Sequence, residues 1–93
     1  MSGMPSSPSP EPPAVGPEMA EERIRAVLAW YSQEIIAERR APHPDEERIR
    51  QLMDARAACA ADQQALLHAD SREAARIADA YAARYAELTR PKR

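Results

Sequence analysis

The stretch IIAERRAPHPDEE, residues 35–47, determines the fold that we expect for this chain. Arg39 and Arg40 suit the negative C-terminal end of a helix dipole, so one helix ends here. Pro42 disfavours helical geometry in the residue before it and stops that helix. Pro44 suits the first position of a second helix, and the three acids that follow it suit the positive N-terminal end. A connection this short makes the two helices antiparallel neighbours.

The helical pattern continues on both sides of this turn, and we expect helices over about 18–41, 44–68 and 71–90. The break between the last two rests on Asp70 and Glu73, which have the spacing of a capping box, and Ser71 is the alternative cap. The sequence therefore predicts an all-α fold, an up-down-up three-helix bundle with a disordered N-terminal tail. If the second and third helices are continuous, the fold is instead a helical hairpin.

Both ends of the chain differ in composition from this helical part. Residues 1–17 contain six prolines and four serines, so we expect a disordered tail with some polyproline II structure. Proline pairs with PxxP spacing occur at residues 5–8 and 10–13. No basic residue flanks them, which favours a linker over a ligand for an aromatic groove. Residues 91–93 form a short basic tail.

The composition excludes several classes of protein. The chain has 93 residues, a formal net charge of −2, one cysteine and two glycines that both precede residue 17. A disulfide framework, a CxxC zinc site and a glycine-rich phosphate loop are therefore excluded. No apolar run approaches the roughly 18 residues that span a bilayer, and the start of the chain has no secretory signal pattern. We expect a cytoplasmic protein that does not enter a membrane.

No pattern in the sequence indicates catalysis. His43 and His68 are the only histidines, and neither has convergent ligands, so we expect no metal and no cofactor. Cys59 falls near the apolar stripe of the second helix, where a small buried side chain is its usual role. The acids occupy first helical turns and charged faces rather than a shared apolar pocket. We therefore expect that the protein is not an enzyme.

The first helix carries the residues that we expect to bind a protein partner. Trp30 and Ile36 lie off its main apolar stripe, on opposite flanks, and a tryptophan near an arginine is typical of a binding hot spot. The alternative is that the third helix covers one flank and an edge of the bundle covers the other. The predicted contact residues are Arg23, Trp30, Tyr31, Ile35 and Ile36. Because the core is thin and the helices are rich in alanine, we expect a homodimer or an accessory or regulatory subunit of a larger partner.

Two residues interrupt the apolar stripe of the second helix, namely Arg56 and Gln63. They form either a polar layer within the core or the edge of the stripe, from which long side chains reach solvent. Two further functions stay open. One is a nucleic-acid-associated regulator that uses the arginine faces of a dimer. The other is a small-molecule site around Arg56, Tyr31 and Tyr85.

Overall fold

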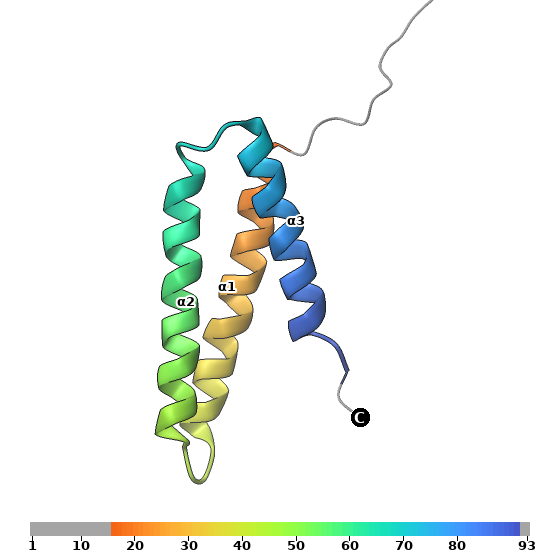
Figure 1. Ribbon diagram of the computed structural model, residues 1–93. Coiled ribbons are helices and arrows are strands. Elements are labelled where there is room, and N and C mark those ends of the chain that lie inside the picture. Colours follow the sequence, from red (N-terminus) through yellow and green to blue (C-terminus); the bar gives the residue numbers. More distant parts are fainter. Residues whose placement is uncertain (1–15, 92–93) are drawn as a thin grey trace, which may run out of the picture.

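The computed structural model describes residues 16–91, which form the helices α1 (Pro17–Arg40), α2 (Glu46–Leu66) and α3 (Ser71–Leu88). Within that range no strand occurs, and α2 runs opposite to α1 and α3 (Figure 1). The predicted all-α three-helix bundle is confirmed. The helical hairpin is excluded, because the chain leaves helical structure between α2 and α3. Residues 1–15 of the predicted N-terminal tail and residues 92–93 of the C-terminal one lie outside the described residues, whereas Pro17, assigned to the N-terminal tail, begins α1.

The beginnings of the helices follow from local chemistry. Gly16 in extended geometry precedes α1, with Pro17 in its first turn. Asp45 caps α2, because its carboxylate accepts a hydrogen bond from the backbone N–H of Arg48 at 3.1 Å. Pro44 therefore lies before α2 and not at its first position, contrary to the sequence prediction. A side-chain cap satisfies one of the backbone donors that a helix leaves unpaired at its start.

The turn between α1 and α2 is also held from the α1 side. The carboxylate of Glu38 accepts a hydrogen bond from the backbone N–H of Asp45 at 3.1 Å. At the other end of α2, Asp70 caps α3 by accepting from the backbone N–H of Glu73 at 2.8 Å. This is the cap that the sequence predicts, and it fixes the point where α3 begins.

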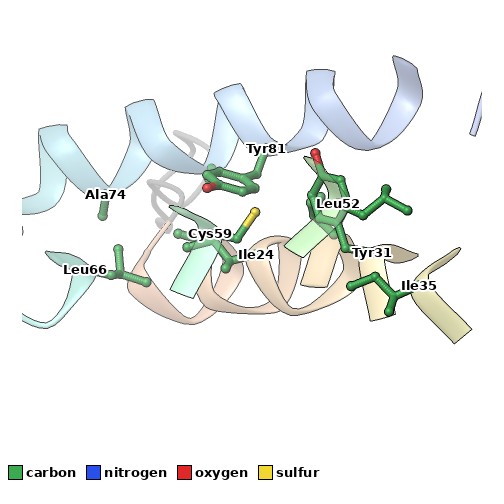
Figure 2. Packing of buried hydrophobic residues seen from close by; sticks show 11 residues of the cluster. Ile24, Tyr31, Ile35, Leu52, Cys59, Leu66, Ala74 and Tyr81 are labelled. Carbon is green, nitrogen blue, oxygen red and sulfur yellow. The ribbon is translucent and has the colours of Figure 1, made fainter. Parts of the chain in front are cut away.

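The core lies along one face of α1, which packs against both α2 and α3, whereas α2 and α3 touch each other little. Figure 1 shows α1 between the other two helices. Figure 2 shows how the core side chains from all three helices meet, with Cys59 and Ile24 beneath the ring of Tyr81. The buried cluster consists of Ala20, Ile24, Val27, Tyr31, Ile35, Leu52, Cys59, Leu66, Ala74, Ala78 and Tyr81. Small side chains at Ala74 and Ala78, both fully buried, allow α3 to lie close to α1.

The position of α3 differs from the one that the sequence suggests. The small-molecule site expected around Arg56, Tyr31 and Tyr85 requires Tyr85 to lie next to Arg56 on α2. In the structure Tyr85 instead lies beside Ala26 and Trp30 of α1. The expectation was wrong because α3 packs on α1 rather than along the length of α2.

The cap of α3 gives the first testable prediction. Asp70→Ala removes the acceptor for the Glu73 N–H, and we expect the free energy of unfolding to fall by about 1 kcal/mol. Chemical denaturation followed by circular dichroism measures this change. The matched control is Asp79→Ala on the same helix, whose side chain is 82% exposed and which we expect to change stability by less than about 0.5 kcal/mol. Equal effects of both substitutions would contradict the importance of the cap.

Candidate interaction surface

Two of the five predicted contact residues lie in the core. Tyr31 is 8% exposed and Ile35 is 2% exposed. Both follow the spacing of Ile24 and Val27 along the face of α1 that the other helices cover. They are therefore unavailable to a partner while the bundle is intact, which corrects the prediction that they form a contact surface.

Arg23 and Trp30 occupy the boundary between α1 and α3. The guanidinium of Arg23 donates a hydrogen bond to the backbone carbonyl of Ala78 at 3.0 Å and lies 4.0 Å from the carboxylate of Asp79. Arg23 thus ties α1 to α3 within the chain. Trp30 is half-buried, and its ring meets the ring of Tyr31 edge-on with the centroids 5.4 Å apart.

The predicted polar layer is absent. No polar or charged residue is buried in residues 16–91. Arg56 is half-buried and donates to the hydroxyl of Ser32 on α1 at 3.2 Å, and Gln63 is half-buried as well. The second interpretation therefore describes these residues better, since both lie at the edge of the apolar stripe.

An exposed apolar site lies on the outer side of the boundary between α1 and α2. Ile36 is 49% exposed and Met53 is 40% exposed. The Ser32–Arg56 hydrogen bond joins α1 to α2 at one level. Ile36 lies one helical turn after Ser32, and Met53 lies almost one turn before Arg56. Because the two helices are antiparallel, both residues lie on the same side of this hydrogen bond. Arg39 lies beside them, with its guanidinium 3.5 Å from the sulfur of Met53. We call Ile36, Arg39 and Met53 the α1–α2 seam.

Met53 and Leu52 are adjacent large apolar residues of α2. The structure places Leu52 against the core, at 3% exposure, and Met53 at the surface. Adjacent residues of a helix point about 100° apart, so only one of the two can face α1 directly. That angle was the signal that Met53 is a surface residue.

A surface depression continues from the seam toward the start of α2. Its apolar side chains are Pro44, Ile49 and Met53. Charged side chains of both signs surround them, namely Arg39, Arg50, Glu46, Glu47 and Asp54. This end of the molecule thus combines an apolar centre with a mixed-charge rim, the usual composition of a protein-binding patch.

On the other flank of α1, a second depression separates α1 from the end of α3. Trp30 and Tyr85 line it, together with Ala26, Ala29, Gln33 and Glu34. Tyr85 is 42% exposed. We call this depression the Trp30–Tyr85 cleft. It lies on the other flank of α1 from the Ser32–Arg56 hydrogen bond, so the structure does not assemble the small-molecule site expected around Arg56, Tyr31 and Tyr85.

A small cluster of side chains joins α2 to α3. The hydroxyl of Tyr81 donates a hydrogen bond to the carboxylate of Asp62. The guanidinium of Arg84 lies 4.8 Å from the centre of the Tyr81 ring and 3.7 Å from the sulfur of Cys59. Burial raises the pKa of Tyr81 above its ordinary value of 10.0, and the hydrogen bond to Asp62 raises it further.

In the described part of the chain, no group of three or more histidine, cysteine, aspartate or glutamate residues is placed to hold a metal ion. None of the three helices has the length and apolar character to cross a membrane. Comparison with protein-family models, curated proteins and solved structures finds no match to this chain.

The Tyr81–Asp62 hydrogen bond predicts how stability depends on alkaline pH. The folded state raises the pKa of Tyr81. The stabilisation that protonated Tyr81 contributes is therefore complete below about pH 10 and is lost as the pH rises further. We expect Tyr81→Phe to lower the free energy of unfolding by about 1 kcal/mol at neutral pH. The same variant should lose less stability than the wild type between about pH 9 and pH 11.

Urea denaturation at a series of pH values measures both effects. Tyr85→Phe is the control, because Tyr85 is exposed and has no hydrogen bond from its hydroxyl among residues 16–91. It should follow the wild-type pH dependence. An identical alkaline decline in the wild type and in Tyr81→Phe would show that Tyr81 does not carry the effect.

Proposed function

We propose that this is a non-enzymatic helical protein that works through protein–protein contacts, with a second copy of itself as the first partner. The observation that carries the proposal is the exposure of two large apolar side chains, Ile36 and Met53, on the two helices joined by the Ser32–Arg56 hydrogen bond. Large apolar side chains gathered at one place on the surface of a small domain are typical of association sites. An accessory or regulatory role toward a larger partner would use the same contact chemistry.

The size of the core supports self-association. The largest fully buried side chains are Ile24, Ile35, Val27 and Cys59, all of modest volume. A domain of this size buries a smaller fraction of its surface than a large domain does, so covering Ile36 and Met53 in a dimer would add stability that the monomer lacks.

The charges around the seam also suit a second copy. Arg39, Glu46 and Asp54 border one depression and form no ion pair within residues 16–91, whereas Arg50 and Glu47 pair with each other. In a two-fold dimer the same patch meets itself, so a patch that carries both signs can place Arg39 against the acids of the partner.

Nucleic-acid binding through the arginine faces has less support. Within residues 16–91, six arginines lie within 4.0 Å of a carboxylate, namely Arg23, Arg25, Arg48, Arg50, Arg76 and Arg90. Paired arginines contribute little to the positive field that attracts phosphates. Steep loss of binding to duplex DNA with added salt would favour this alternative over the apolar contact.

Sedimentation equilibrium on the full chain tests the proposed dimer. We expect a concentration-dependent dimer in the wild type and at least about tenfold weaker association in the double variant Ile36→Glu, Met53→Glu, because burying unpaired carboxylates is costly. Leu67→Glu is the control, since Leu67 is 73% exposed but lies at the opposite end of α2. A monomeric wild type, or equal weakening by the control, would contradict association through the seam.

A further inference from the structure

The Trp30–Tyr85 cleft has the composition of a site that recognises proline-rich segments. Two aromatic side chains flank it, and the alanines Ala26 and Ala29 leave room between them. Proline-rich segments in polyproline II conformation bind aromatic-lined grooves of this kind because the helix is already formed before binding. Proline rings pack on aromatic faces, while the free backbone carbonyls accept hydrogen bonds.

The cleft also offers hydrogen-bond donors for such carbonyls. The indole N–H of Trp30 has no hydrogen-bond partner within residues 16–91, yet no unpaired buried side-chain atom occurs there. The N–H of the half-buried Trp30 therefore reaches solvent. The hydroxyl of Tyr85 and the amide of Gln33, both exposed residues, are further donors at the cleft.

The chain itself carries a segment of matching chemistry. Prolines stand at positions 5, 8, 10, 12 and 13, and this stretch enters α1 at Gly16. We call residues 5–13 the proline segment. We propose that the Trp30–Tyr85 cleft is a binding site for proline-rich segments in polyproline II conformation, and that its occupant is the proline segment of the same chain.

The length of the connection fits this assignment. Trp30 follows Gly16 by 14 residues, a distance of about 21 Å along a helix. A polyproline II chain rises about 3.1 Å per residue, so about seven residues cover that distance. Running back along α1, the proline segment thus reaches the cleft with Pro8 and Pro10, and Pro8, about 25 Å from Gly16, is level with Gln33.

The path between Gly16 and the cleft is suitable as well. Met19, 43% exposed, lies on the same flank of α1 as Ala26 and Trp30, at helical spacing. Arg23 lies between them on that flank.

Trp30 is the only tryptophan of the chain, so its fluorescence reports directly on the cleft. The experiment compares the full chain with a variant in which Pro5, Pro8, Pro10, Pro12 and Pro13 are all replaced by serine. We expect the acrylamide quenching constant of Trp30 to rise by about twofold in this variant, as the indole face becomes accessible. Its emission maximum should move to longer wavelength. The matched control replaces Ser6, Ser7 and Ser9 by alanine and should behave like the wild type.

Two further experiments test whether the proline segment binds at the Trp30–Tyr85 cleft. Tyr85→Ala removes one wall of the cleft, and because Tyr85 is exposed the helix is retained. In that background the five proline substitutions should no longer change quenching. A synthetic peptide of residues 1–15, added at millimolar concentration to the five-proline variant, should restore the protection of Trp30.

In the wild type, the protection of Trp30 from acrylamide should also be independent of protein concentration, because the proline segment and the cleft belong to one chain. Protection that disappears on dilution would place the segment on a second copy and overturn the intramolecular assignment. Equal quenching of the wild type and the five-proline variant, with no response to the peptide, would overturn the binding site itself. The inference does not depend on the α1–α2 seam, so the Ile36 and Met53 variants leave these readings unchanged.

Discussion

The structure depends on the way α3 rests on α1. Two fully buried alanines, Ala74 and Ala78, bring the helices close, and Arg23 donates to the carbonyl of Ala78 across the boundary. Close approach increases dispersion contacts between the helices, which compensates for the small size of the side chains. The packing of α3 on α1 also determines which flanks of α1 stay exposed.

One consequence is that the two flanks of α1 have different chemistry. Where α3 covers α1, the boundary leaves a cleft lined by Trp30 and Tyr85. Where α3 does not reach, the α1–α2 hairpin exposes Ile36 and Met53. The proposed self-association and the proposed proline-segment site therefore occupy separate surfaces, and a single chain can use both at once.

The sequence was sufficient to predict the helices and their order, because proline and aspartate act locally. Pro42 ends a helix and Asp70 begins one through interactions within a few residues. The helix against which α3 packs was not predictable in the same way. It depends on whether Ala74 and Ala78 pack on α1 or on α2, and alanine has too little shape for periodicity to decide between them. Tyr85 was consequently assigned to Arg56 and missed as a wall of the cleft, although Trp30 was identified as a surface candidate.

Cys59 adds a property that concerns motion rather than packing. It is fully buried beneath Tyr81 and Arg84, both on α3. A thiol reagent can therefore reach its sulfur only when α3 leaves the α1–α2 hairpin or the whole chain unfolds. The rate of modification of this single thiol thus records how often one helix detaches, and comparison with global unfolding separates local opening from complete loss of the fold.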